Sequence, residues 1–404
     1  MTATAALWRE LAQRLADELA TEGVLRTPAW RVAVEEIPRH VFVPRFYVQQ
    51  SGGRWVETTG EADGWLAAVY RNEPLITELA VAASGNRVIV SSSTKPGLMV
   101  RMLEVLDVHD EHRVLEIGTG TGYNAGLLSH RLGADRVFSI DIGAGLVDAA
   151  RDRLAALGLA PTLSVAHGVG GMPEHAPFDR IIATCSLPAV PWAWAEQVRE
   201  GGLVLVDVKR SVHAGNLVLL TRHADRLEGR FLPRWAGFMA IRDADRAPDG
   251  ATTVGDVQAG IRSMTDLEPL PWSSLVPWFL TQARLPSELT FGYRGVTKNG
   301  PEWAVFSARD GSWCAVGMQA DIVGRREVRQ DGSVNLWDEF EATHRMWDGL
   351  GQPGWDRLGL TVTPDGLHRV WLDDPDSDFE WSLPPIIHLR SSARTSERSF
   401  GKVP

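Results

Sequence analysis

A short apolar run that ends in an acid and three alternating glycines constrains this chain more than any other stretch. It spans residues 114–124, Val114-Leu-Glu-Ile-Gly-Thr-Gly-Thr-Gly-Tyr-Asn124. Its β-favouring residues predict a buried strand that leads into a helix from about Tyr123 to Leu132. Because Gly118, Gly120 and Gly122 lack a Cβ, the turn between strand and helix can approach a ligand closely.

The spacing of these glycines distinguishes between ligands. A dinucleotide fold uses G-x-G-x-x-G, whereas this chain has G-x-G-x-G preceded by Glu116, which suits a ligand without phosphates. A second apolar run, Arg136-Val-Phe-Ser-Ile140, ends at Asp141, where an acid can accept hydrogen bonds from both hydroxyls of a ribose. Together these features predict S-adenosylmethionine as cofactor and S-adenosylhomocysteine as its product. The alternative is a glycine turn that only packs a strand against a helix.

Strands and helices alternate between residues 113 and 208, which predicts an α/β fold with a mostly parallel sheet and helices on both faces. In such sheets ligands bind at the carboxyl ends of the strands, where both the glycine turn and Asp141 fall. The expected strands start at residue 114 and continue at 136–140, 162–166, 179–184 and 203–208, with helices expected at 123–132, 145–157 and 192–199.

The N-terminal segment is predicted to be largely helical. Leucines at helical spacing predict a helix from Ala5 to Thr21, followed by a second segment over 28–37. Further on, four hydroxyl residues, Ser91 to Thr94, precede Lys95-Pro96 and a helix expected over 97–106. One hydroxyl is enough to cap a helix, so the others could orient a substrate carboxylate. A plain cap with solvent-facing serines is the alternative.

Composition narrows the possible partners. A formal net charge of -10 argues against nucleic acid, whose phosphates need a basic surface. No apolar stretch approaches the roughly 18 residues that cross a membrane. The two cysteines, Cys185 and Cys314, have no CxxC spacing, which favours a reducing cytoplasm. His40, His167 and His175 match no zinc pattern, so we expect no metal, and we interpret Cys185 as a small core residue.

The region after residue 230 is predicted to be α+β. It contains two hairpin patterns, one around Asp310-Gly311 and one around Pro364-Asp-Gly366, with a helix between them that ends near Gly351. Ten of the 16 tryptophans lie in this region, and we expect them to form a core rather than a ligand platform. The last residues, 391–404, are polar and lack periodicity, which predicts a mobile tail.

Several sequence blocks, in one order, resemble the protein-L-isoaspartate O-methyltransferase family. The block around Pro173 is specific to that family, and together the blocks cover roughly residues 5–230. The resemblance implies a Rossmann-like class I sheet and an S-adenosylmethionine-dependent protein or peptide carboxyl O-methyltransferase. The blocks are Pro38-Arg-His-Val-Phe-Val-Pro44, Glu73-Pro-Leu-Ile76, the hydroxyl run before Lys95-Pro96, Leu115–Asn124, Pro173-Glu-His-Ala-Pro-Phe-Asp-Arg-Ile-Ile-Ala-Thr184, Ala189-Val-Pro191 and Gly201-Gly202.

The same resemblance implies the site residues. Thr94 stands where the family has a serine beside the reacting carboxylate, and we group Ser93 and Ser92 with it as catalytic candidates. Ala166-His-Gly168 replaces the family's usual Gly-Asp-Gly near the adenine, and Gly97 replaces a larger residue, which predicts a different substrate pocket. The implied cofactor contacts are Glu116, Gly118, Thr119, Gly120, Gly122, Tyr123, Asn124, Asp141, Ile142, Gly168 and Val169.

About 170 residues follow the part that resembles the family, and they carry the finer hypothesis. The whole chain, including Gly229–Met239 and Gly359–Gly366, resembles a variant group encoded beside graspetide-forming ATP-grasp ligases or lanthipeptide synthetases. That group implies methylation of an aspartate in a ribosomally made precursor peptide, already cyclised by such an enzyme, with the ester closing to an aspartimide.

This hypothesis divides the chain into three parts and leaves two alternatives. Residues 1–230 form a catalytic domain, with a helical, substrate-facing part at 1–110, and 231–390 form a peptide-recognition domain before the tail. The alternatives are general repair of isoaspartate in damaged proteins and a non-catalytic module that binds the peptide. Methyl transfer to an ionised carboxylate needs no strong base, and positioning alone can contribute roughly 7–11 kcal/mol.

Overall fold

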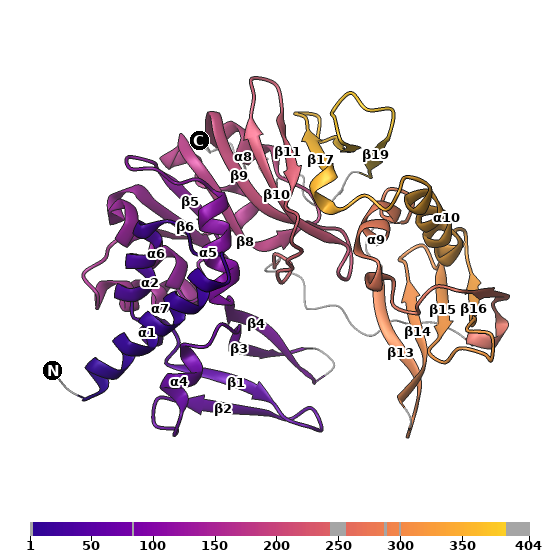
Figure 1. Ribbon diagram of the computed structural model, residues 1–404, viewed down its shortest axis with the longest axis horizontal. Helices are drawn as coiled ribbons and strands as arrows, with labels where there is room; N and C mark the ends of the chain where they lie inside the picture. Colours follow the sequence, from indigo (N-terminus) through magenta and orange to yellow (C-terminus); the bar gives the residue numbers. More distant parts are fainter. Residues whose placement is uncertain (1–2, 83–84, 243–255, 287–288, 299, 385–404) are drawn as a thin grey trace, which may run out of the picture.

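The chain folds around one large sheet flanked by two smaller ones (Figure 1). The computed structural model describes residues 3–82, 85–242, 256–286, 289–298 and 300–384. Its α-helices are α1 (Ala3–Thr21), α2 (Pro28–Glu36), α3 (Arg39–Phe42), α4 (Trp65–Val69), α5 (Pro96–Val105), α6 (Tyr123–Leu132), α7 (Ala144–Ala155), α8 (Trp192–Gln197), α9 (Leu275–Thr281) and α10 (Leu336–Gly349). Short 3-10 turns occur at Ala134–Arg136, Gly168–Gly170, Pro173–His175, Val257–Ala259, Pro271–Ser273 and Trp355–Arg357.

The central sheet has ten strands in the order β19-β18-β17-β11-β10-β9-β8-β5-β6-β7. Its half from β9 to β7 is parallel, and from β9 to β19 every neighbouring pair is antiparallel. The alternation of strands and helices predicted for residues 113–208 is confirmed. The strands are β5 (Val114–Ile117), β6 (Val137–Asp141), β7 (Thr162–Val165), β8 (Phe178–Leu187), β9 (Val198–Lys209), β10 (Gly215–Arg222), β11 (Leu227–Phe231), β17 (Leu358–Val362), β18 (His368–Leu372) and β19 (Glu380–Leu383).

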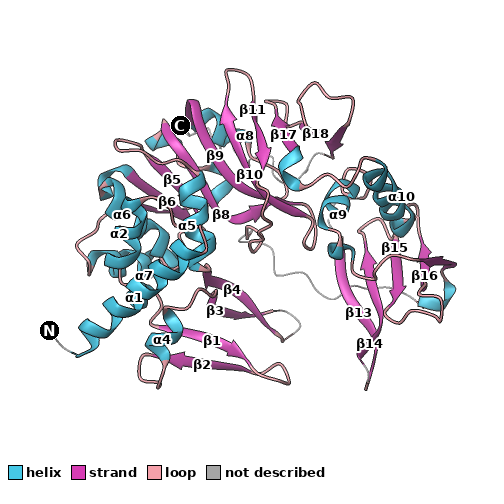
Figure 2. Ribbon diagram, viewed as in Figure 1, coloured by secondary structure: helices cyan, strands magenta, loops and turns pink. Residues whose placement is uncertain are grey.

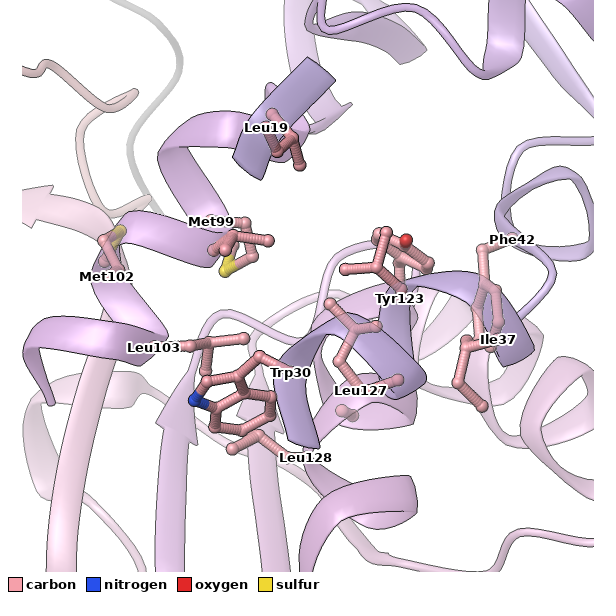
Figure 3. Close-up of a cluster of buried hydrophobic side chains, with 14 of the residues drawn as sticks. Leu19, Trp30, Ile37, Phe42, Met99, Met102, Leu103, Tyr123, Leu127 and Leu128 are labelled. Carbon is pink, nitrogen blue, oxygen red and sulfur yellow. The ribbon is translucent and has the colours of Figure 1, made fainter. Parts of the chain in front are cut away.

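Helices cover both faces of this sheet because its strands are apolar on both faces (Figure 2). On one face α1, α2, α5 and α6 bury a shared core. Figure 3 shows part of it, with Trp30 among Leu103, Leu127 and Leu128. On the other face lie α8 and α9, and Trp194 of α8 is fully buried there. Within the described ranges, no helix combines the length and apolar character needed to cross a membrane.

A second sheet of four antiparallel strands, in the order β2-β1-β3-β4, lies beside the N-terminal helices (Figure 1). The sequence patterns did not predict it as a sheet, because most of its residues are only half-buried on either face and leave no clear alternation. Its last strand carries the hydroxyl run that leads into α5. The strands are β1 (Arg45–Gln49), β2 (Trp55–Thr59), β3 (Leu75–Val81) and β4 (Arg87–Ser93).

The C-terminal region contributes a third sheet of five antiparallel strands and also returns to the central one. Both predicted hairpins are confirmed: β14 pairs with β15, and β17 pairs with β18. However, β17–β19 join the central sheet through β11, so hydrogen bonding crosses the boundary predicted at residue 230. That division stays a prediction, and the predicted tail at 391–404 lies outside the described residues. The third sheet consists of β12 (Ile261–Thr265), β16 (Arg326–Asp331), β15 (Trp313–Gly317), β14 (Gly300–Ser307) and β13 (Thr290–Thr297).

Tryptophans of the C-terminal region mostly lie in its cores, as expected. Trp278 and Trp337 pack between α9, α10 and the five-stranded sheet, and Trp355 and Trp371 are buried against the central sheet. Trp235 is the most exposed of the ten. The aromatic content of this region is therefore largely structural.

Candidate functional site

One cleft brings the predicted cofactor and substrate segments together. Its volume is ≈ 2570 Å³, well above the roughly 300–1,000 Å³ of a typical small-molecule pocket, so it can hold a cofactor and part of a second ligand. It lies at the carboxyl ends of β5, β6 and β8, where ligands of α/β sheets bind. Its walls include the glycine turn, Asp141, the hydroxyl run 91–94, and residues 165–170 and 234–242.

The glycine turn adopts a backbone conformation that requires glycine. The φ angles of Gly118, Gly120 and Gly122 are +100°, +51° and +87°. A Cβ on Gly118 would lie 2.6 Å from Thr184 Oγ1, which donates a 2.7 Å hydrogen bond to the carbonyl of the same glycine. The N–H of Gly118 donates to Ile140 O at 2.8 Å. Neighbouring strands β6 and β8 thus hold the turn open towards the cleft.

Asp141 lies at the end of β6 and faces this turn, as predicted. Its Oδ2 accepts a 2.9 Å hydrogen bond from the N–H of Gly120, and its Oδ1 accepts one of 3.0 Å from the N–H of Gly143. Arg242 Nη2 lies 3.5 Å from Oδ1 and forms an ion pair that the sequence did not predict. A carboxylate has about four acceptor positions, so at least one stays available to a ligand hydroxyl.

Glu116 and Asn124 form a buried polar network beneath the turn. Glu116 Oε1 accepts a hydrogen bond of 2.8 Å from Asn124 Nδ2, and its Oε2 accepts one of 2.5 Å from Ser139 Oγ. Ser139 Oγ is also 2.7 Å from Thr119 Oγ1. Burial raises the pKa of Glu116 to about 7 despite these bonds. Within the described residues Asn124 Oδ1 has no partner, so this amide keeps an unused acceptor beside the cleft.

The remaining predicted cofactor residues surround the same space. Tyr123 begins α6 and packs its ring against Phe42, and burial raises its pKa to about 12. Ile142 directly follows Asp141 along the wall of the cleft. Gly168 O accepts a 2.9 Å hydrogen bond from Trp194 Nε1, and a Cβ at this position would lie 2.6 Å from Ile117 Cγ2. Segment 166–169 is thus held in place by the hydrogen bond to its Gly168 carbonyl and by the close packing of Gly168 against Ile117.

The hydroxyl run of β4 divides between two faces of the strand. Ser91 and Ser93 are buried, whereas Ser92 lies on the opposite face and Thr94 follows the strand. Ser91 Oγ lies 3.9 Å from where a Cβ of Gly120 would be, so Ser91 faces the glycine turn, although the catalytic candidates from the sequence are Ser92, Ser93 and Thr94. Ser92 and Thr94 also line the cleft, so the structure brings all four hydroxyls to its wall.

The proline-flanked block near residue 40 contains a buried arginine that links several segments around the cleft. Arg39 is 0% exposed, and its guanidinium donates to Val69 O at 2.6 Å, Arg71 O at 3.0 Å and Glu73 O at 3.1 Å. It also donates to Ser93 Oγ and to Thr94 O, both at 3.3 Å. Burial lowers its pKa to about 10. Arg39 therefore positions the hydroxyl run. Its place in the proline-flanked block was the only sequence signal for it.

Lys209 lines the cleft and lies beside a fully buried acid, Asp207, and no sequence pattern predicted either residue as part of the site. Asp207 Oδ2 accepts a 2.8 Å hydrogen bond from the N–H of Phe238, and Lys209 Nζ lies 3.8 Å from the same oxygen. Lys209 also donates to Phe238 O. Burial raises the pKa of Asp207 to about 6. These contacts fix the segment that leads to Arg242.

Neither of the two cysteines is poised to act as a nucleophile. Burial raises the pKa of Cys185 to about 12, which disfavours its reactive thiolate form, and Cys314 is buried in the C-terminal core. The described residues contain no group of three acids, histidines or cysteines arranged to hold a metal ion.

Comparison with known proteins points to one family. A family model described as Protein-L-isoaspartate(D-aspartate) O-methyltransferase (PCMT) matches residues 64–231. The chain is 42% identical over 137 residues to the protein-L-isoaspartate O-methyltransferase of Methylorubrum populi, which covers 34% of this chain and 64% of that protein. It is 32% identical over 214 residues to the one of Rhodospirillum rubrum, covering 52% of this chain and 84% of that protein.

A solved structure of a protein-L-isoaspartate O-methyltransferase also resembles this one. The two superpose with a TM-score of 0.50 and 19% sequence identity, over 90% of this chain and 100% of that chain. At this identity the likeness establishes a shared fold. The fold is the class I S-adenosylmethionine-dependent methyltransferase sheet, with an extra antiparallel C-terminal region.

Proposed function

This chain belongs to the protein-L-isoaspartate O-methyltransferase family, and from that premise we propose that it methylates a side-chain carboxylate of a protein or peptide. It is an S-adenosylmethionine-dependent protein carboxyl O-methyltransferase. The observation that carries the proposal is the meeting of the glycine turn, Asp141 and the hydroxyl run in one cleft.

The cleft's own residues fit the cofactor. Asp141 has an acceptor position left for a ribose hydroxyl. The positive φ angles of the turn favour glycine, and because glycine has no Cβ the backbone of the turn is open to a ligand. Residues Ile142, Gly168 and Val169 would contact the adenosine part, and Glu116 and Asn124 would support the turn from beneath. When bound, S-adenosylmethionine supplies an electrophilic methyl group on a sulfonium.

The chain's part in the reaction is to orient the acceptor and exclude water. A carboxylate titrates near ~4, so it is already ionised at neutral pH and no base has to deprotonate it. The hydroxyls of Ser91, Ser93 and Thr94 can donate to one of its oxygens and orient the other without neutralising the charge. Arg39 fixes the backbone that carries them.

Two substrate classes fit this reaction, and the family favours isoaspartate in damaged proteins. The second class, an aspartate of a ribosomally made, previously cyclised precursor peptide, is supported by one feature: residues 256–384 lie beyond the family match at 64–231 and add a five-stranded sheet. In that case the ester closes to an aspartimide. The two free cysteines fit a cytoplasmic location for either role.

Methyl transfer to defined peptides tests the function. Isoaspartyl peptides of unrelated sequence should all gain one methyl group if the enzyme repairs damage, whereas a precursor encoded near this gene should be strongly preferred if it matures peptides. Mass spectrometry and kcat/KM measure both. No transfer to either, with S-adenosylhomocysteine still bound, would instead favour a non-catalytic binding module and contradict the proposal.

Substitution of Asp141 tests the cofactor site separately. Asp141→Asn removes an acceptor that is worth about 1.5–3 kcal/mol, so S-adenosylhomocysteine should bind roughly 10- to 150-fold more weakly in calorimetry. Asp152→Asn, an exposed change on α7, is the matched control and should bind normally. Equal affinities for the two variants would contradict the site. Thr94→Val should lower kcat and leave this affinity unchanged.

A further inference from the structure

Three cations line the cleft with no side-chain hydrogen bond or ion pair in the described part of the chain. They are Lys95 at the start of α5, Arg101 on the same helix, and Arg234 after β11. None of their side chains forms an ion pair or a hydrogen bond with the described residues, although most of the described arginines do. An unpaired cationic group in a cleft is unusual in a chain whose net charge is -10.

Arg101 and Arg234 line the same cleft, and both carry a positive charge. Partial burial, and after it the charge of Arg234, lower the pKa of Arg101. Arg101 Nε is buried and has no hydrogen-bond partner within the described residues. Two unpaired guanidiniums that line one cleft are complementary to a carboxylate, which can accept from both.

The acids of the cleft do not balance these charges. Glu116 is fully buried and bonded to Asn124, and Asp141 is engaged with backbone N–H groups and Arg242. Glu22 accepts from the side-chain amide of Asn72. The fourth acid that lines the cleft, Glu196, lies on α8 and forms no ion pair with Arg101 or Arg234.

The position of Arg101 on α5 sets its separation from Lys95, which directly follows the hydroxyl run. Gly97, Leu98 and Arg101 share one helix face along the cleft, because residues three and four apart are neighbours on a helix. Arg101 is six residues beyond Lys95, or roughly 9 Å along the helix axis. An extended peptide covers that distance in about three residues.

We propose that Arg101 and Arg234 form a subsite for a side-chain carboxylate of the peptide substrate, two or three residues from the acid that is methylated. The inference rests on the proposed function and adds a substrate class to it, namely acidic peptides. Gly97 does not widen this subsite, because a Cβ there would point at Asn72 and Leu19 instead.

Matched peptides test the subsite. Isoaspartyl peptides with amidated C-termini would carry Glu, Gln or Lys three residues from the acceptor, on either side. Binding to the full chain with S-adenosylhomocysteine is followed by fluorescence anisotropy, and methylation by kcat and KM. We expect the Glu peptide to bind about tenfold more tightly than the Gln peptide on one side of the acceptor, and this preference to weaken with salt.

Variants identify the residues responsible. Arg234→Gln and Arg101→Gln should each remove the preference for Glu, so that the Glu and Gln peptides bind with equal affinity, and Arg234→Glu should reverse the preference in favour of Lys. Arg14→Gln, an exposed change on α1 outside the cleft, is the charge-matched control and should keep the preference.

The outcomes separate the inference from the proposed function. Charge-dependent binding without methylation supports the subsite and contradicts the function. Methylation of all peptides with no preference for Glu, or a preference that survives in both glutamine variants, overturns the subsite and leaves the function standing. A preference for Glu that disappears with Arg14→Gln also overturns it, because it then reflects overall charge.

Discussion

Replacement of Arg39 by methionine should destabilise the enzyme and separate cofactor binding from catalysis. Methionine keeps much of the side-chain volume but donates to none of the four carbonyls and the hydroxyl that Arg39 serves. The carbonyl of Val69 is buried and finds no water, which costs about 1–3 kcal/mol. The other bonds to the charged group add to this cost, and removal of a buried charge offsets part of it. We expect a net loss of about 3 kcal/mol in the free energy of unfolding.

The functional effect follows from the acceptors on the hydroxyl run. Without Arg39 the segment around Ser93 and Thr94 loses its anchor, and displacements of about 1 Å at a reacting centre can lower rates by about 100-fold. The affinity for S-adenosylhomocysteine should stay within about threefold of the wild-type value, because the glycine turn and Asp141 belong to other elements. Urea unfolding, calorimetry and kcat measure these quantities.

Two further variants make this test specific. Arg39→Lys keeps the charge but has three donors in place of a planar fork, so it should lie between the wild type and Arg39→Met, and it serves as the test if the methionine variant does not accumulate. Arg14→Met, at an exposed position of α1, should match the wild type. Wild-type stability and kcat in Arg39→Met would refute the anchoring role. Hydrogen exchange should localise the change to residues 69–73 and 91–95.

Two other changes probe the glycine turn and the network beneath it. Gly118→Ala forces a Cβ against Thr184 at a positive φ, so it should lower the free energy of unfolding by about 1–3 kcal/mol and weaken S-adenosylhomocysteine binding. Gly145→Ala, where no atom lies within 4 Å of the added Cβ, is the control and should do neither. Equal melting temperatures and affinities for the two variants would count against the turn's role. Burial raises the pKa of Glu116 from 4.5 to about 7, so its contribution to stability is complete below about pH 4.5 and is lost as the pH rises through 7. Glu116→Gln should therefore melt higher than the wild type at pH 8 and show a flatter pH profile, and identical profiles would show that Glu116 does not titrate in this range.

The sequence predicts the central sheet well because each of its elements carries its own local signal. The helix predicted from Tyr123 to Leu132 has those bounds in the structure, since a glycine turn precedes it and Gly133 ends it. Strands β1 and β2 gave no such signal, because both their faces are partly exposed. Turn chemistry predicts that β17 pairs with β18, but it does not predict that β17 also pairs with β11, which depends on packing over a long separation.

The candidate site divides in the same way. The glycine turn and Asp141 are predictable because fixed spacings place them at strand ends. Arg242 meets Asp141 across 101 residues and Arg39 meets Ser93 across 54, and no local pattern encodes either contact. The orientation of Ser91 is also not predictable locally, since strand alternation decides which hydroxyls of the run face inward, and the sequence leaves that register open.

The return of β17–β19 to the central sheet also has a consequence for synthesis. On the ribosome, β11 is complete at Phe231, but its neighbour β17 begins only at Leu358, which is 127 positions later. At 5–20 residues per second, translation of that stretch takes roughly 6–25 s, during which one side of β11 has no strand partner. An open strand edge is prone to pair with other chains. The nascent protein therefore depends on residues 358–383 to cover that edge of its central sheet.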